Sequence, residues 1–313
     1  MWTPGTRRKI LEESFSTLRE EFELNPKKPS FKLTYTASKI WPHRESATNI
    51  LKRSSTNSNS LTTPIRIAIL SASFNPPTKA HLQLLIQSAI DVKLDLKRIS
   101  STKDVSFFDA CLLLYSANNA DKLVLPSDAG PIDRLLMMEA LAAHINSVHY
   151  NEVQNVAVGV CSHGRFLDQA KALLSFFSSS NIGNSNPMNV SLYFLMGFDT
   201  IVRFYDPKYY SDIHKELQTF FETSYIICAN RDGYGGEKVE EEFFESKTVV
   251  DLSGKEKVIR VKLDQEIAKM SSTNVRKFIR EECRSDHSDR EERIKKIVYE
   301  MCPEPVSEFI IEE

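Results

Sequence analysis

Apolar residues along this chain alternate between short uninterrupted runs and longer runs of helical periodicity. An uninterrupted run is typical of a strand buried on both faces of a sheet, whereas apolar positions three and four apart are typical of an amphipathic helix. The predicted strands cover 65–71, 110–116, 156–161, 191–197, 225–230 and 258–263. The predicted helices between and after them cover 82–92, 133–145, 165–177, 211–221 and two segments near the C-terminal end. This alternation predicts a doubly wound α/β fold with a mainly parallel sheet.

The segments before the first predicted strand have a different character. Residues 10–24 carry apolar side chains at helical spacing, so residues 1–43 are interpreted as a helical arm docked on the rest of the protein. Residues 44–64 are rich in Ser, Thr and Asn and predict a mobile linker or insertion. Residues 65–313 then form the main domain with its C-terminal helices. Within it, the Gly-rich turn and acidic run of 232–257 predict a surface excursion.

Composition narrows the class of protein. The chain is 41% hydrophobic and 26% charged with a net charge of −2, so no global field would recruit nucleic acid or an anionic membrane, and any phosphate site must be local. The five cysteines are an odd number without metal-ligand spacing. No apolar run approaches the ~20 residues of a membrane span, and no signal-peptide pattern opens the chain. We therefore expect a reduced protein of the cytoplasm, the nucleus or both, without a metal site of its own.

The stretch SASFNPPTKAHL lies between the first predicted strand and the following helix. In open α/β sheets, ligands bind beyond the carboxyl ends of the strands, where helix N-termini present backbone N–H groups. Pro76 and Pro77 stiffen the turn, and Thr78 is a candidate N-cap for a helix that begins at Lys79. His81 would share one face with Thr78, which favours a phosphate site. Alternatively, Thr78 only caps the helix and His81 is a polar residue of its first turn.

A second stretch, KMSSTNVRKFIR, follows the last predicted strand and has a similar design. It offers Ser271, Ser272 and Thr273 as caps and places Arg276 three residues into a helix that starts near Asn274. An arginine at the start of a helix opposes the macrodipole at a cost of about 0.3–1 kcal/mol, so an anion between the two is the better explanation. Bidentate pairing with a phosphate supplies that anion.

These two stretches resemble the GxFxPxTxxH and ISSTxxR signatures of the nucleotidylyltransferase superfamily. LYFLMGFDTIVRFYDPKYY (192–210) resembles the GxDxLxxFxxP segment of the nicotinamide mononucleotide adenylyltransferases, and IICANRDG (226–233) resembles the strand and RxG turn that follow it. The four motifs occur in the family's order from about 65 to 283. The chain is most similar to the divergent fungal group of that family, which implies a Rossmann-like nucleotidylyltransferase fold.

The resemblance also implies an ATP site. In it, Thr78 and His81 contact the phosphates, Arg276 holds the β- and γ-phosphates together with the caps, and Asp199 accepts a hydrogen bond from the ribose. The ATP-binding residues implied in this way are Ser73, Phe74, Thr78, His81, Gly197, Asp199, Ser272, Thr273 and Arg276. Taken alone, Asp199 is better explained as an N-cap of the next helix, but Gly197 two residues before it and Pro207 eight residues after it favour the ribose contact.

The catalytic residues implied are His81, Arg276 and Lys122, which the family places toward the transferred phosphate; the alternative for Lys122 is a solvated loop lysine. The acceptor-binding residues implied are Arg134, His163, Phe166 and Arg231. Arg134 resembles the arginine that begins the corresponding helix in the family; the alternative is a charged residue on the surface of the helix. For His163, the alternative to acceptor binding is a structural role at the end of a strand. Phe166 and Gln169 of FLDQAKAL stand where the family's WxxTxxxL pattern has Trp and Thr. Phe166 would stack on the nicotinamide or, alternatively, pack in the core beside Ala170 and Leu173.

The activity implied is adenylyl transfer from ATP to nicotinamide mononucleotide, which gives NAD and pyrophosphate. Mg²⁺ would bridge the phosphates, held by substrate oxygens and water. One alternative is a sibling adenylyltransferase with another phosphorylated acceptor. Another is a nucleotide-binding or ATP-hydrolysing regulatory protein that has lost transferase activity. The sequence carries no signal for the oligomeric state.

Overall fold

The computed structural model describes residues 4–39, 41–43, 64–97, 107–117, 128–179, 188–254 and 256–312. Its centre is a seven-stranded sheet with the order β1-β4-β3-β2-β5-β6-β7, in which only the β1–β4 pair is antiparallel. The strands are β1 (Phe31–Thr36), β2 (Ile65–Ala72), β3 (Ala110–Ser116), β4 (Val156–Cys161), β5 (Val190–Gly197), β6 (Ser224–Ala229) and β7 (Val258–Val261). The six parallel strands confirm the six predicted ones, and their order is that of a Rossmann-like fold.

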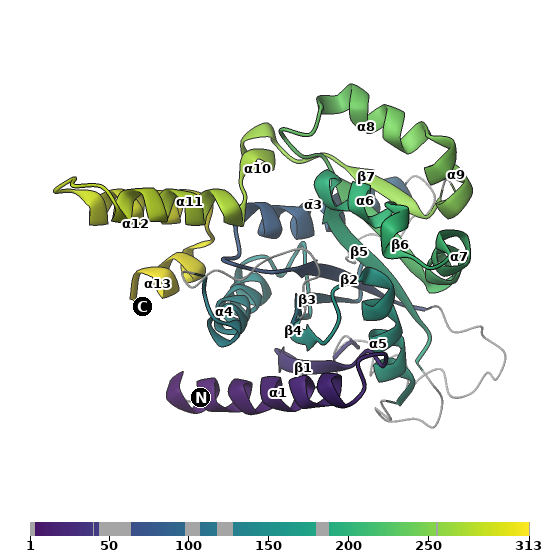
Figure 1. Cartoon of the computed structure of the whole chain (residues 1–313), viewed down its shortest axis with the longest axis horizontal. Helices are drawn as coiled ribbons and strands as arrows, with labels where there is room; N and C mark the ends of the chain where they lie inside the picture. Colours follow the sequence, from purple (N-terminus) through teal and green to yellow (C-terminus); the bar gives the residue numbers. More distant parts are fainter. Residues whose placement is uncertain are drawn as a thin grey trace.

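Helices cover both faces of this sheet (Figure 1). One face carries α1 (Pro4–Leu24), α3 (Lys79–Lys97), α4 (Pro131–Val148), α11 (Ser272–Cys283), α12 (Arg290–Met301) and α13 (Glu304–Glu312). The other face carries α5 (Phe166–Ser179), α6 (Phe198–Phe204), α7 (Ile213–Thr223) and α9 (Lys247–Ser253). The remaining elements are α8 (Gly236–Glu245), α10 (Gln265–Lys269) and the short 3₁₀ helix η1 (Pro207–Tyr209). This double layer confirms the doubly wound arrangement.

The uninterrupted apolar runs follow from this burial on two sides. Along β3 every residue is buried, with Leu113 packed on the side of α4 and Leu112 on the side of α5. Each buried aliphatic side chain of this kind contributes about 1.5–3 kcal/mol to the stability of the fold. A polar residue at either position would face a dry core, which is why the strands show no alternation.

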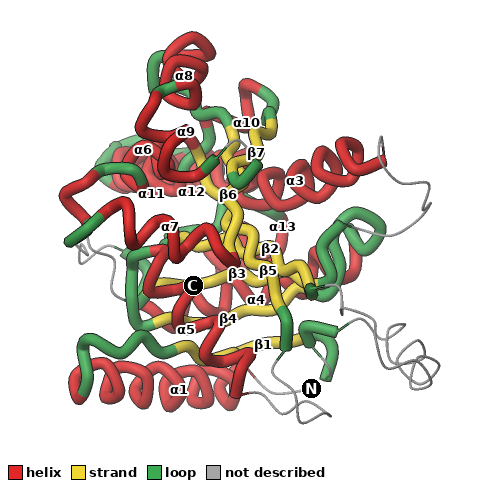
Figure 2. The backbone as a smooth tube through the Cα atoms, turned by 90° about the vertical axis from the view of Figure 1, so that its right-hand side faces the viewer, coloured by secondary structure: helices red, strands yellow, loops and turns green. Residues whose placement is uncertain are grey.

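The N-terminal arm is built into the main body of the protein. α1 begins at Pro4, earlier than the predicted start, and buries Leu11 and Leu18 completely against the sheet-facing core. β1, which the hydrophobic pattern did not predict, adds an antiparallel edge strand to β4. Figure 2 shows the strands stacked from β1, beside α1, to β7, beside α10. The predicted linker falls outside the described residues apart from Pro64.

The predicted surface excursion of 232–257 is more ordered than its composition indicated. It contains α8 and α9, and α9 contributes Val249 and Leu252 to the core. The ring of Phe243 in α8 packs edge-on against Phe198, with 5.3 Å between the centroids. The acidic side chains of the run lie mostly on the outer face of these helices. Across the described part of the chain, no helix combines the length and the hydropathy that crossing a membrane requires.

Candidate active site

The sheet has a topological switch point between β2 and β5. From β2 the chain proceeds outward through β3 and β4 and then returns to the other side of β2 as β5, which pairs with β2 along its length. Ligands of doubly wound folds bind in the crevice beyond the carboxyl ends of the strands at such a point. The loop after β2 and the start of α6 after β5 both lie at this place. These are the segments that carry two of the four sequence motifs.

The loop between β2 and α3 has an unusual backbone that its neighbours hold in place. Phe74 adopts a positive φ of 43° and is fully buried, with its ring 5.2 Å from that of His81. The side-chain oxygen of Asn75 accepts a hydrogen bond from the backbone N–H of Ala129 at 3.3 Å. The carbonyl of Ser73 accepts one from Arg134 at 3.4 Å. Ser73 and Phe74, which the family resemblance implied as ATP-binding residues, therefore stabilise the conformation of the loop through a backbone hydrogen bond and a buried ring.

Thr78 and His81 form a pair at the start of α3, which begins at Lys79 as predicted. The backbone N–H of Thr78 donates to Nδ1 of His81 at 3.0 Å, and the Thr78 hydroxyl lies 2.8 Å from the same nitrogen. Because a backbone N–H only donates, Nδ1 is the acceptor and the neutral ring carries its proton on Nε2. Thr78 is fully buried, so its side chain orients the imidazole instead of meeting a ligand itself.

The start of α11 docks on this loop. The helix begins at Ser272, two residues before the predicted position, and its N-cap is Ser271, whose hydroxyl accepts from the N–H of Asn274 at 3.1 Å. The prediction that Ser272 and Thr273 are caps was therefore wrong. The Ser272 hydroxyl instead donates to the carbonyl of Pro76 at 2.8 Å and joins α11 to the loop. Thr273 is exposed.

Arg276 lies in the second turn of α11 and points into the same loop. Its Nη1 donates to the carbonyl of Asn75, and its Nε lies 3.1 Å from Oδ1 of Asp128. Burial lowers the pKa of Arg276, the Asp128 carboxylate opposes that change, and the nearby guanidinium groups of Arg280 and Arg134 add to it. An arginine remains charged at such a position, so the site concentrates positive charge.

Arg134 reaches this site from the first turn of α4. Its Nε donates to the carbonyl of Ala129 at 2.8 Å, and its guanidinium lies 5.9 Å from the ring centroid of Tyr115. With 7% of its surface exposed, Arg134 is not the surface charge that the sequence left open as an alternative. Sequence reasoning missed Asn75 and Asp128, which complete the polar surroundings. Nothing in their local sequence distinguishes them from ordinary turn residues.

Gly197 and Asp199 lie on the β5 side of the switch point. A Cβ at position 197 would come within 2.8 Å of Oδ1 of Asp199, so any other residue there would displace this carboxylate. Asp199 lies in the first turn of α6, whose N-cap is Gly197, so the N-cap alternative for Asp199 was wrong. Its two oxygens face Arg231 at 3.9 Å and Arg203 at 3.5 Å. The carboxylate keeps 28% exposure, enough to meet a ligand hydroxyl.

Arg231 supports the other half of the site. Its Nη1 donates to the carbonyls of Ala268 and Met270, at 2.9 and 2.7 Å, which fixes the turn that leads into α11. The structure therefore places Arg231 between Asp199 and the segment of Arg276. These contacts give Arg231 a structural position, which the acceptor role implied by the family resemblance did not predict.

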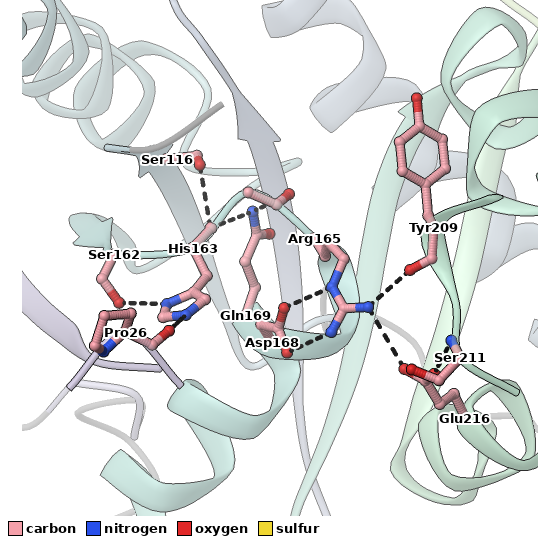
Figure 3. A network of polar contacts seen from close by, with 11 residues as sticks. Pro26, Ser116, Ser162, His163, Arg165, Asp168, Gln169, Tyr209, Ser211 and Glu216 are labelled. Atoms are coloured by element: carbon pink, nitrogen blue, oxygen red, sulfur yellow. Dashed lines mark hydrogen bonds and ion pairs between the residues drawn. The ribbon is translucent and has the colours of Figure 1, made fainter. Parts of the chain in front are cut away.

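His163 and Phe166 lie away from this cluster, at the end of β4 and the start of α5. Nδ1 of His163 lies 2.7 Å from the Ser162 hydroxyl, and Nε2 lies 2.8 Å from the carbonyl of Pro26 in the arm (Figure 3). Both ring nitrogens are thus engaged, which favours the structural alternative. The ring of Phe166 packs edge-on against Phe194 and Phe204, with centroids 5.7 and 6.0 Å away, as the core-packing alternative predicts.

One implied catalytic residue has no counterpart among these contacts. Lys122 lies outside the described residues. Within the described ranges, no group of three or more His, Cys, Asp or Glu side chains is arranged to hold a metal ion. The described side chains around the loop after β2 are guanidinium and imidazole groups with the carboxylate of Asp128. They do not form a carboxylate set of the kind that holds a magnesium ion by itself.

Comparison with known proteins adds one relative. No family model matches this chain. It is 32% identical over 168 residues to a protein of Schizosaccharomyces pombe with a provisional assignment as a nicotinamide mononucleotide adenylyltransferase. The match spans 53% of this chain and 53% of the yeast protein, so about half of the relative's length is matched. The relative's provisional assignment names the family that the four motifs resemble.

Two solved structures show a more distant likeness. Both are of the Plasmodium falciparum nicotinic acid mononucleotide adenylyltransferase, one complexed with NaAD and one with APC, and each is 16% identical to this chain. Each alignment covers 79% of this chain. It covers 95% of the chain complexed with NaAD and 94% of the chain complexed with APC, with TM-scores of 0.47 and 0.48.

Proposed function

We propose that this chain, as a relative of the nicotinamide mononucleotide adenylyltransferases, transfers the adenylyl group of ATP to a pyridine mononucleotide and releases pyrophosphate. The observation that carries the proposal is the convergence of His81, Arg134 and Arg276 at the switch point of the sheet. These side chains come from the starts of three helices that are far apart in the sequence. The positive charge of the two guanidinium groups and the N–H donors of all three side chains match the triphosphate of a nucleotide.

Each of these residues has a role that its contacts support. The Nε2–H of His81 is oriented by Thr78 and donates to a phosphate oxygen on which charge develops during transfer. Arg276 binds the β- and γ-phosphates through its guanidinium edge. Arg134, held by carbonyls of two different loops, adds fixed positive charge beside them. Asp199 accepts a hydrogen bond from the ribose of ATP.

In-line attack of the acceptor phosphate on the α-phosphorus needs little covalent participation by the protein. Positioning of the two phosphates and neutralisation of charge supply most of the acceleration. A substrate-bound Mg²⁺ adds to that neutralisation. The site fits this chemistry because it offers rigid hydrogen-bond donors. Lys122 is proposed as a further cation toward the transferred phosphate.

The acceptor is proposed to be nicotinamide mononucleotide. A specific observation favours a second candidate, a sibling adenylyltransferase with another phosphorylated acceptor. His163 is tied to the arm and Phe166 packs in the core, so neither side chain presents itself for ring stacking on a nicotinamide.

The test is a pyrophosphate-release assay with ATP and Mg²⁺ and a panel of acceptors. The panel contains nicotinamide mononucleotide, nicotinic acid mononucleotide and ribose 5-phosphate, and the Arg276→Ala variant serves as the negative control. Product with either pyridine nucleotide supports the proposal, and their relative rates identify the acceptor. ATP binding without product from any acceptor would favour a regulatory protein that has lost transferase activity.

A further inference from the structure

Asp128 occupies a position that neither the motifs nor the proposed chemistry uses. It lies three residues before α4, and its side chain is only 7% exposed. Its Oδ1 lies 3.1 Å from Nε of Arg276, whose side chain is 18% exposed. Although close, these two buried atoms are not aligned for a hydrogen bond with each other. Their attraction is therefore mainly coulombic, and a better-aligned anion would replace it readily.

The carboxylate of Asp128 faces the guanidinium group of Arg276, which is the group proposed to bind the phosphates. A polyphosphate that reaches Arg276 brings several negative charges close to a buried carboxylate, and like charges in such surroundings repel strongly. The charges around Arg276 favour an exchange. Among the described groups that act on Arg276, the carboxylate of Asp128 stands against the guanidinium groups of Arg134 and Arg280, so the cluster has a net positive charge that a phosphate neutralises better.

We propose that Asp128 is a built-in competitor for the phosphate site: it pairs with Arg276 when nucleotide is absent and is displaced by the β- and γ-phosphates. It lowers the affinity for ATP and, by re-forming its pair with Arg276, speeds the release of pyrophosphate. The inference rests on the proposed function, because it requires that Arg276 binds phosphates. To that function it adds Asp128 as a residue that sets the affinity of the site for ATP and pyrophosphate.

The experiment measures dissociation constants for ATP and for inorganic pyrophosphate by calorimetry on the full chain, with Mg²⁺ and with EDTA. Asp128→Asn keeps the shape of the side chain and removes its charge, and we expect roughly tenfold tighter binding of both ligands, equivalent to about 1.4 kcal/mol. Asp133→Asn is the matched control, because Asp133 pairs with Arg8 of the arm at 2.6 Å, and it should leave both constants within twofold. In an Arg276→Ala background, Asp128→Asn should change neither constant.

Melting temperatures accompany every measurement, and Asp128→Ser replaces Asp128→Asn if the asparagine variant does not fold. Unchanged or weaker binding of both ligands by a folded Asp128 variant would overturn the inference. Weaker binding only in the presence of Mg²⁺ would also overturn it, because Asp128 would then act with the phosphates and not against them. Tighter pyrophosphate binding by a protein that does not bind ATP would support the competitor and contradict the proposed function.

Discussion

At the scale of single residues, His81 is the side chain with the most defined hydrogen-bond donor. Because Thr78 fixes Nδ1 as an acceptor, the ring presents its Nε2–H in one direction. We expect His81→Ala to lower kcat about 10²–10³-fold and to change the KM for ATP less than threefold, since a donor to developing charge acts in the transition state. Steady-state kinetics with the pyrophosphate assay measures both constants.

His81→Gln is the matched control, because a glutamine amide places an N–H donor close to the position of Nε2. This variant should recover at least part of the lost turnover. If alanine and glutamine reduce kcat equally while the melting temperature falls, His81 supports the loop and does not assist transfer.

For Arg276, the proposed contact with the phosphates predicts a larger effect on the affinity for ATP than on turnover. Removal of its guanidinium leaves the phosphates without a bidentate partner, and contacts of this kind contribute about 1.5–3 kcal/mol. Arg276→Ala should therefore weaken ATP binding about 10- to 100-fold by calorimetry, and Arg276→Lys should restore only part of the affinity. Lys277→Ala, one residue further along α11 with an exposed side chain, is the control and should bind as the unchanged chain does. An equal loss of ATP affinity in Arg276→Ala and Lys277→Ala would indicate that the net charge of α11, and not a specific contact of Arg276, determines binding.

Phe166 is expected to act through packing. Its edge-on contacts with Phe194 and Phe204 would be lost in Phe166→Ala, at a cost of about 2 kcal/mol, below the 3–5 kcal/mol typical of fully buried aromatic rings. Chemical denaturation measures this loss. The KM values for ATP and acceptor should change together if at all. A selective rise in the acceptor KM at an unchanged free energy of unfolding would restore the stacking interpretation.

Individual residues were predictable where a motif places chemistry at a helix start. Thr78 and His81 contact each other, as their spacing predicted, and Arg276 contacts the same loop at Asn75. The caps of α11 were misplaced because three consecutive hydroxyl residues offer equivalent N-caps, and only the contact of Ser272 with Pro76 selects among them. Asp128 was not predictable, since its partner is distant in sequence and its own loop carries no periodic signal.

At the scale of elements, the contact between α1 and α4 has a pH dependence. Burial raises the pKa of Glu139, and its hydrogen bond and charge interaction with Arg7 oppose that rise. In Arg7→Ala the opposition is lost, so the pKa of Glu139 rises further. Between the unfolded and the folded pKa, the folded protein holds a proton that the unfolded chain has released, so stability falls as pH increases through this window.

Arg7→Ala should therefore lower the free energy of unfolding by about 2 kcal/mol at pH 8, below the 3–5 kcal/mol for fully buried pairs, and by less at pH 5. Denaturant titrations at the two pH values measure the difference. Arg19→Ala is the control, because its pair with Glu23 is exposed and contributes little at either pH. A penalty that is equal at both pH values would contradict the role given to Glu139.

The strands were predictable to different degrees for a physical reason. The six parallel strands are buried on both faces, so their apolar runs are uninterrupted and stand out from the helical pattern. β1 lies at the edge of the sheet with all of its residues half-buried, and FKLTYT carries no comparable run. The short helix α6 follows β5 without a break, so its apolar residues merge with those of the strand.

At the scale of the whole molecule, the arm behaves as part of one cooperative body. Removal of residues 1–36 would uncover the edge of β4 and the core that Leu11 and Leu18 seal. We expect such a truncated chain to melt at a lower temperature and to self-associate through the open edge, measured by calorimetry and light scattering. A monomeric truncated chain with an unchanged melting temperature would show that the arm is a separate unit.

His81, Arg134 and Arg276, which form the proposed phosphate site, lie near the beginning, the middle and the end of the main domain, and Arg276 belongs to α11. On a ribosome, which releases the chain from its N-terminal end, the loop after β2 emerges long before its arginine does. A nascent chain that stops before Ser272 lacks the helix that closes the loop, however complete its sheet. Under the proposed function, nucleotide binding would therefore be one of the last properties that the growing polypeptide acquires, and a nucleotide already present in solution would favour the finished molecule over every shorter intermediate.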